Sequence, residues 1–254
     1  MLGVYLSGTG NTRHCVEKLL GIISPEGKAI PIEDKDVRDF IIANDEILLA
    51  YPTQFSNVPY MVKDFINKNS DIWAGKKVLC LTTMGAFSGD GTGCSARILK
   101  KYGAEILGGL QIKMPDSVCD SKLLKKTLED NKRIVKAADS KLEHAGREIR
   151  NPGRYPKEGL SFFAHIAGLF GQRLWFYGKT ADFSTKLKVG DACIGCAKCV
   201  ASCPMQNLEI INGKAVPKGK CTMCYRCIST CPKRAITLLG KEVTEQCRFE
   251  KYEG

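Results

Sequence analysis

Two runs of cysteines carry the residues with the clearest chemistry in this chain. Each run has the spacing C-x2-C-x2-C-x3-C-P. The first run consists of Cys193, Cys196, Cys199 and Cys203, and the second of Cys221, Cys224, Cys227 and Cys231. Thiolates at this spacing bind 4Fe–4S clusters, and the fourth cysteine of each run ligates the cluster of the other run. The spacing therefore predicts two clusters.

Three closely spaced cysteines cover one corner of a cubic cluster, so the fourth ligand must come from elsewhere in the chain. We expect one cluster on a first quartet made of Cys193, Cys196, Cys199 and Cys231. We expect the other on a second quartet made of Cys221, Cys224, Cys227 and Cys203. Zinc would explain pairs of cysteines but not a third and fourth before a proline. Disulfides need an oxidising compartment, and the sequence shows no secretory signal.

The cysteine runs resemble those of the bacterial two-cluster ferredoxins. Residues 232–236 match the turn that usually follows their motif, and residues 204–208 are a degenerate copy of it. Asn212 and Gly213 predict a hairpin turn between the two runs. The resemblance implies a small α+β ferredoxin domain over residues 184–240.

A second candidate site lies near the start of the chain. Residues 2–6 are apolar and predict a buried strand, and residues 15–20 have helical periodicity. The loop between them is Ser7-Gly8-Thr9-Gly10-Asn11-Thr12. Backbone N–H groups and hydroxyls in such a loop converge on an anion at the positive end of the helix. Arg13 stands where a Rossmann loop needs its third glycine, and the Gly-Lys-Ser/Thr of a P-loop is absent.

This loop resembles the S/T-x-T-G-N-T loop of flavodoxins. The resemblance implies that Ser7, Gly8, Thr9, Gly10, Asn11 and Thr12 hold the phosphate of FMN by hydrogen bonds, without a cationic side chain. A plain strand-to-helix turn that binds nothing is the alternative.

The rest of the first 150 residues alternates between strands and helices. Further strands are expected at 28–31, 46–50, 78–83 and 106–112, and helices at 60–66 and 94–102. A long last helix is expected to carry Leu124, Leu128, Val135, Ala138, Leu142, Ala145 and Ile149 on one face. Repeated βα units predict a parallel sheet covered by helices. We therefore expect a doubly wound α/β domain over residues 1–150, with the flavodoxin strand order 2-1-3-4-5.

Ligands of such sheets bind at the carboxyl ends of the strands. By resemblance to flavodoxins, the loops after the third and fourth strands would hold the isoalloxazine ring. The candidate residues in the first loop are Pro52, Thr53, Gln54, Phe55, Ser56 and Asn57. Those in the second loop are Thr83, Met84, Gly85, Ala86, Phe87 and Gly89. Phe55 and Phe87 are candidates for stacking on the ring, and packing in the core is the alternative for each.

Residues 151–183 are expected to connect the two domains. Residues 150–156 are rich in proline and glycine and predict a linker, and residues 160–177 form an aromatic-rich helix. Packing between the domains is the favoured role of that helix, and docking to a partner or a membrane surface is the alternative. Residues 241–254 form a polar tail. Five cysteines lie outside the runs, and of these Cys94 is a weak redox candidate and Cys247 has no assigned role.

The 254 residues carry a formal charge of +11. Two clusters with their thiolates would lower this to roughly +7. A basic surface favours acidic redox proteins as partners, and no nucleic-acid motif is present. The sequence has no apolar run of about 18 residues, so no integral membrane segment is expected. The cysteines favour a reducing, anoxic cytoplasm as the compartment of this protein.

Together these features resemble flavodoxin–ferredoxin fusion proteins of anaerobes. The resemblance implies an electron carrier that uses FMN and two 4Fe–4S clusters to couple one-electron carriers to a two-electron partner. An alternative is a flavin-dependent reductase whose clusters supply electrons to FMN at a small-molecule substrate. A redox sensor would need an effector module, and the sequence shows none.

Overall fold

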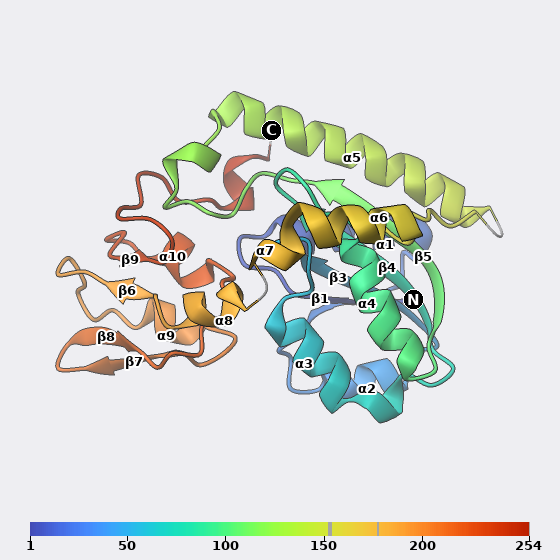
Figure 1. Cartoon of the computed structure of the whole chain (residues 1–254), viewed down its shortest axis with the longest axis horizontal. Helices are drawn as coiled ribbons and strands as arrows, with labels where there is room; N and C mark the ends of the chain where they lie inside the picture. Colours follow the sequence, from blue (N-terminus) through green and yellow to red (C-terminus); the bar gives the residue numbers. More distant parts are fainter. Residues whose placement is uncertain (152–153, 177, 254) are drawn as a thin grey trace.

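The structure is a computed structural model that describes residues 1–151, 154–176 and 178–253. Figure 1 shows a large α/β domain beside a small module of short strands and helices. A connector helix lies over the large domain between them, and the C-terminus returns to lie beneath the long helix α5. The small module is therefore fastened to the large domain by more than one segment of the chain.

The large domain is built on one five-stranded parallel sheet. Its strand order is β2-β1-β3-β4-β5, and every neighbouring pair is parallel. This confirms the predicted flavodoxin-like order. The strands are β1 (Leu2–Tyr5), β2 (Ala29–Pro31), β3 (Glu46–Pro52), β4 (Lys77–Met84) and β5 (Glu105–Lys113).

Helices cover both faces of this sheet. Successive strand residues point to opposite faces, so Leu49 and Cys80 belong to one buried cluster, whereas Leu48 and Leu79 belong to another. The first cluster lies under α2 (Val37–Ile42), α3 (Tyr60–Lys68) and α4 (Gly91–Lys101), and the second under α1 (Asn11–Ile23) and α5 (Leu128–Arg150). The strands are buried on both sides, which explains their continuous apolar sequences.

Helix α5 begins later than its leucine spacing predicted. Leu124 lies instead in the short turn η2 (Lys122–Leu124). Thr127 caps α5, because its hydroxyl accepts a hydrogen bond from the Asp130 N–H at 3.1 Å. A threonine cap determines where a helix begins, and an apolar residue one turn earlier does not extend the helix past that cap. The six-residue helix α2 was not predicted.

The small module contains two antiparallel pairs and two short helices. Strand β6 (Lys188–Val189) pairs with β9 (Ile236–Thr237), and β7 (Leu208–Ile211) pairs with β8 (Lys214–Pro217). The hairpin between β7 and β8 turns at Asn212 and Gly213, with φ values of 48° and 75°, as the sequence predicted. The helices α9 (Lys198–Ser202) and α10 (Arg226–Thr230) occupy equivalent positions in the two cysteine runs.

The C-terminal tail packs on the large domain although its composition is polar. Phe249 and Tyr252, in and beside the turn η4 (Phe249–Lys251), are buried against α1 and α5. The Phe249 ring stacks on His14 at 4.1 Å between centroids, and its N–H donates to the Thr9 carbonyl at 2.8 Å. The tail thus reaches the loop between β1 and α1.

The connector is helical, and much of its apolar surface is exposed. It forms α6 (Phe162–Gly168), the π-helical turn η3 (Leu169–Arg173) and α7 (Leu174–Phe176), and α8 (Lys179–Ser184) follows. Residues 152–153 of the predicted linker and residue 177 of the predicted helix lie outside the described residues. Several large apolar side chains of the connector are exposed and do not pack between the domains; they are Phe162, Phe163, Phe170, Leu174 and Trp175.

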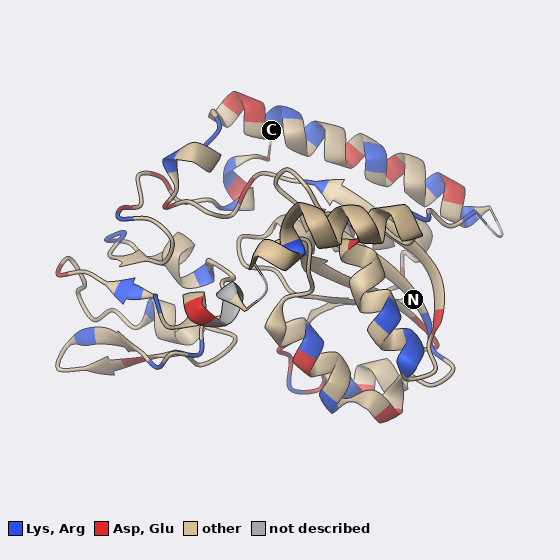
Figure 2. Ribbon diagram, viewed as in Figure 1, with Lys and Arg blue, Asp and Glu red and all other residues tan. Residues whose placement is uncertain are grey.

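Figure 2 shows that α6 carries almost no charge, whereas α5 alternates in sign along its length. In the described part of the chain, no helix combines the length and apolar character needed to cross a membrane.

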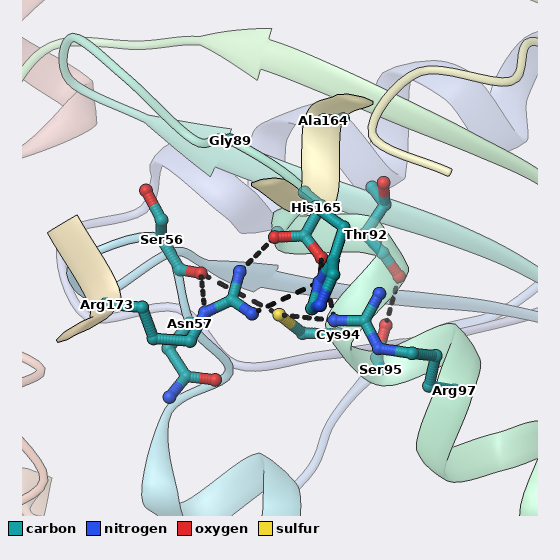
Figure 3. Close-up of polar contacts among 12 residues, drawn as sticks. Ser56, Asn57, Gly89, Thr92, Cys94, Ser95, Arg97, Ala164, His165 and Arg173 are labelled. Atoms are coloured by element: carbon teal, nitrogen blue, oxygen red, sulfur yellow. Dashed lines mark hydrogen bonds and ion pairs between the residues drawn. The ribbon is translucent and has the colours of Figure 1, made fainter. Parts of the chain in front are cut away.

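A buried carboxylate anchors the connector to the large domain. Asp90, at the start of α4, accepts hydrogen bonds from Arg97 at 2.7 Å and His165 at 2.9 Å, and it also pairs with Arg173. Figure 3 shows the Arg97, His165 and Arg173 side chains converging. Burial alone would raise the pKa of Asp90, but these three partners outweigh it and hold the pKa below its ordinary value.

Replacing this carboxylate should release the connector. We expect Asp90→Asn to lower the free energy of unfolding by about 2–3 kcal/mol, less than the loss for a fully buried ion pair because Arg97 and His165 are partly exposed. Urea unfolding would measure this loss. Trypsin should also cut faster after Arg173, which the anchored connector shields.

Asp71→Asn is the matched control, because Asp71 pairs with Arg38 on the surface. It should change neither stability nor cleavage.

The pH dependence has a definite direction. Since the folded-state pKa of Asp90 is lowered, the stability that Asp90 gives the folded protein is complete above the unfolded pKa of 3.8 and is lost only as the pH falls through the folded pKa. Equal behaviour of the two variants at neutral pH would contradict the anchoring role.

Candidate functional site

The loop between β1 and α1 has the shape of an anion cradle. Gly10 precedes α1 with φ of 97°, a left-handed conformation that favours glycine. The side chains of Ser7, Thr9, Asn11 and Thr12 are all buried. The Ser7 hydroxyl is buried and has no hydrogen-bond partner within the described chain. A buried hydroxyl seldom lacks a partner, and a bound phosphate oxygen would supply one.

Hydrogen bonds tie this loop to two neighbouring strand ends. The Thr12 and Thr83 hydroxyls lie 2.8 Å apart, and the Thr9 and Ser117 hydroxyls lie 3.1 Å apart. The Asn11 amide donates to the Pro115 carbonyl at 2.7 Å. The loops after β1, β4 and β5 therefore form one polar rim at the carboxyl edge of the sheet, the edge where α/β proteins bind ligands.

A cavity of about 300 Å³, which we call the flavin cavity, opens at this rim. Its size is that of a small-molecule site. Fourteen of the eighteen predicted flavin contacts line it; they are Ser7, Gly8, Thr9, Asn11, Thr12, Pro52, Thr53, Gln54, Phe55, Thr83, Met84, Gly85, Ala86 and Phe87. The other four do not line the cavity but belong to the same loops; they are Gly10, Ser56, Asn57 and Gly89.

The loop after β3 is held in an uncommon conformation. Phe55 and Ser56 have positive φ values of 50° and 56°, and Gln54 and Asn57 exchange backbone hydrogen bonds at 3.0 and 3.1 Å. Ser56 is fully buried and donates to the Gln172 side chain of the connector at 2.8 Å. The connector therefore braces this loop as well as the loop after β4, which it meets at Asp90.

The two phenylalanines proposed for stacking are in different surroundings. Phe55 lines the flavin cavity, but its ring already stacks on Phe176 at 4.3 Å. Phe87 also lines the cavity and is 44% exposed, so its ring is open to a ligand. Of the two residues, the structure leaves Phe87 more available to cover a bound ring.

Sequence reasoning missed three further parts of the cavity wall. One is the loop after β5, which contributes Asp116, whose pKa burial raises. The rule that ligands meet the carboxyl ends of strands could have indicated this loop. The second part is Gln172 of the connector. The third comes from the small module and consists of Met223, Cys224, Tyr225 and Leu239.

The cysteines of the small module gather around two separate cavities. All four members of the first quartet line one of them, and all four members of the second quartet line the other. In each cavity, the fourth cysteine comes from the opposite run, which is the grouping that crossed ligation would require. Each cavity therefore offers four thiols as ligands, the number that a 4Fe–4S cluster needs.

Backbone N–H groups are aimed at sulfurs of both quartets. Asn207 N–H donates to Cys203 and Ala235 N–H donates to Cys231, both at 3.3 Å. These two donors stand four residues after their cysteines, so the two runs repeat one local geometry. Hydrogen bonds to sulfur stabilise the charge of a bound cluster and tune its potential. Burial raises the pKa of the Cys224 thiol to about 11, so a metal must displace its proton.

The quartets differ in exposure. Cys196 of the first quartet is exposed, and its cavity is also lined by Lys198 and Lys233. The second quartet lies against the large domain, and Cys224 and Tyr225 line both its cavity and the flavin cavity. The first quartet shares no lining residue with the flavin cavity. The second quartet is therefore the one adjacent to the flavin cavity.

The contact between the two domains is close at Gly8. A Cβ atom at this position would lie 1.7 Å from the Cys224 carbonyl oxygen. Arg226, the first residue of α10, donates to the Ser7 carbonyl at 2.7 Å and pairs with Glu33 at 2.6 Å. The cluster-binding run thus packs directly on the candidate phosphate loop.

A second buried carboxylate fixes the turn after β9. One oxygen of Asp120 accepts from the Tyr225 hydroxyl at 2.9 Å. The other accepts three backbone N–H groups, those of Leu238, Leu239 and Gly240, at 2.7 to 3.1 Å. The loop after β5 therefore holds Tyr225 and Leu239, two residues of the flavin-cavity wall.

Comparison with known proteins agrees with the assignment of the small module. Residues 186–232 match the family model described as a 4Fe-4S dicluster domain. This segment contains every cysteine of both quartets. No curated protein matches the chain.

Solved flavodoxins resemble the large domain. The two-electron reduced flavodoxin of Megasphaera elsdenii is 22% identical, with a TM-score of 0.42, over 58% of this chain and 99% of that one. Flavodoxin 2 of Bacillus cereus is 20% identical, with a TM-score of 0.42, over 57% of this chain and 94% of that one. The fold assignment rests on the parallel strand order rather than on these matches. The chain thus joins an α/β domain of flavodoxin-like fold to a 4Fe–4S dicluster domain.

Proposed function

We propose that this protein is an electron-transfer protein that holds FMN and two 4Fe–4S clusters and couples one-electron carriers to a two-electron partner. When bound, the flavin accepts or releases one or two electrons, and each cluster carries one. The observation that carries the proposal is the wall shared through Cys224 and Tyr225 by the flavin cavity and the cavity of the second quartet.

The residues around the flavin cavity fit FMN. The unpaired Ser7 hydroxyl and the positive end of α1 are suited to its phosphate. Gly85 allows the loop after β4 to approach the loop after β5, because a Cβ there would lie 2.3 Å from Asp116. The small module and the connector line further sides of the cavity, through residues such as Tyr225 and Gln172.

The surface near Cys196 is the proposed contact for a redox partner. Cys196 is exposed, and Lys198 and Lys233 line the same cavity. With the formal charge of +11 on the chain, these lysines favour an acidic protein partner. This arrangement supports electron exchange with partners at the first quartet and with the flavin cavity through the second.

Anaerobic titration of cofactor-loaded protein tests this function. We expect neither NADH nor NADPH to bleach the flavin and cluster bands, and we expect a reduced ferredoxin to bleach both, because the proposed entry point is a protein-docking surface. The visible spectrum is the readout. Rapid bleaching by either nucleotide would favour the flavin-dependent reductase instead. A spectrum without flavin absorption would rule out the assignment of FMN to the large domain.

The contact at Gly8 predicts that one methyl group will uncouple the two domains. Gly8→Ala places a Cβ against the Cys224 carbonyl and should force the phosphate loop and the second quartet apart. We expect FMN to bind at least about tenfold more weakly, a loss of ~1.4 kcal/mol. Fluorescence titration of FMN measures the affinity, and iron analysis checks the clusters.

Gly21→Ala is the control, since Gly21 lies in α1 with no atom near its added Cβ. It should bind FMN like the wild type. If Gly8→Ala did so too, with full iron content, the proposed close packing would be wrong.

Single ligand variants should separate the two quartets. Cys196→Ala and Cys224→Ala each remove one thiolate from a different quartet, so each should lose one cluster by iron analysis and electron paramagnetic resonance. Both should slow reduction of bound flavin by a reduced ferredoxin. Cys94→Ser, outside both quartets, should keep its full iron content. Reduction at the wild-type rate in Cys196→Ala would contradict entry at the first quartet.

A further inference from the structure

Two cysteines outside the quartets meet next to the flavin cavity. Cys119 follows β5, and Cys247 belongs to the C-terminal tail. Both line a small cavity that also contains Asp116, Val118 and Leu124. These last three residues also line the flavin cavity, so the two cavities are neighbours.

The two thiols interact, and this interaction moves their pKa values in opposite directions. The hydrogen bond from Cys247 lowers the pKa of Cys119 to about 7, although burial opposes this, and the same contact raises the pKa of Cys247. Cys247 is thus the proton donor of the pair, and Cys119 has the lower pKa of the two. Both cysteines belong to or pack on the core of the small module. Each is a free thiol in this structure.

Other roles for the pair are less well supported. Neither cysteine belongs to a quartet. Packing alone would not require two thiols in contact, since a buried lone cysteine such as Cys94 behaves as a small apolar residue whose pKa burial raises to about 11.

We propose that Cys119 and Cys247 are a redox-active pair that forms a reversible disulfide by exchange with a low-molecular-weight disulfide. Cys247 is the more exposed of the two. As its sulfur attacks one sulfur of the reagent, its proton passes to the Cys119 thiolate, and the first released thiolate then takes that proton from Cys119. The Cys119 thiolate then attacks the Cys247 sulfur, and the second reagent thiolate leaves. The protein loses two electrons, and the reagent gains them.

The disulfide would lock the tail onto the large domain. Two residues after Cys247, Phe249 stacks on His14 and donates to the carbonyl of Thr9 in the candidate phosphate loop. Closing a covalent loop between residues 119 and 247 restricts the unfolded chain and opposes release of the tail. The redox state of the pair would therefore set how firmly the tail supports this loop.

Peptide mass mapping tests the proposal. Cofactor-loaded protein is equilibrated anaerobically with reduced and oxidised glutathione at increasing ratios of the oxidised form, quenched in acid and alkylated. We expect a peptide that joins Cys119 to Cys247, lighter by two hydrogens than the free pair, to accumulate with the oxidised form and to disappear on reduction. In Cys247→Ser, Cys119 should be recovered as the alkylated thiol.

Cys94 is the matched control within the same protein. It is 6% exposed against 7% for Cys119, so the two have the same access to reagents. It should be alkylated at every ratio. The proposal is overturned if Cys119 and Cys247 also remain thiols throughout, if they link only between molecules, or if Cys94 is oxidised in parallel. The readout is a mass, so it succeeds or fails independently of the electron-transfer function.

Discussion

The contact between the Gly8 backbone and the Cys224 carbonyl is the constraint on which the rest of the structure depends. It leaves no room for a side chain at residue 8, so the candidate phosphate loop and the second cysteine run are packed backbone to backbone. An intervening side chain would separate the two cavities, and here they share Cys224 and Tyr225. The candidate phosphate loop has no cationic side chain of its own, so an anion bound there would be held by its buried hydroxyls and N–H groups.

Such a contact persists only if both partners are held in place. The chain leaves the large domain at the end of α5 and must return to the carboxyl edge of the sheet to build the second quartet. Three attachments achieve this. The connector is fixed at Asp90, the turn after β9 at Asp120, and the tail at Phe249. The first two attachments are buried carboxylates, Asp90 and Asp120, and each accepts hydrogen bonds from several donors. These charge-assisted hydrogen bonds fix the orientation of the attached segments as well as stabilising them.

The parts of the molecule that sequence predicts well are those in which the chemistry is local. Four thiols around a cube require a fixed spacing, and a loop that binds phosphate must join a buried strand to a helix. Three thiols of each quartet lie within seven residues of sequence, and the candidate phosphate loop is equally short. The fourth thiol comes from the other run, and the structure gathers each quartet around one cavity. The parallel sheet follows in the same way, because apolar strands alternate with helices, and its strand order was expected from the match to the flavodoxin order.

Prediction failed where distant segments decide the outcome. Nothing near Gln172 or Leu239 indicates that these residues reach the flavin cavity. The polar composition of the tail conceals Phe249 and Tyr252, whose burial depends on the groove between α1 and α5. Leucine periodicity placed the start of α5 too early, because one capping hydroxyl at Thr127 outweighs a matching residue one turn upstream.

The two quartets lie in different environments although their sequences are nearly repeated. Reduction adds negative charge to a cluster, and burial in a medium of low dielectric opposes added charge. The second quartet packs against the large domain, and burial raises the pKa of Cys224 and Cys221, as it also does for Cys199 of the first quartet. The first quartet has an exposed member and two neighbouring lysines, which favour added charge. The two cysteine motifs therefore provide sites that differ in exposure and in neighbouring charge. This difference arises because only the second quartet packs on the large domain.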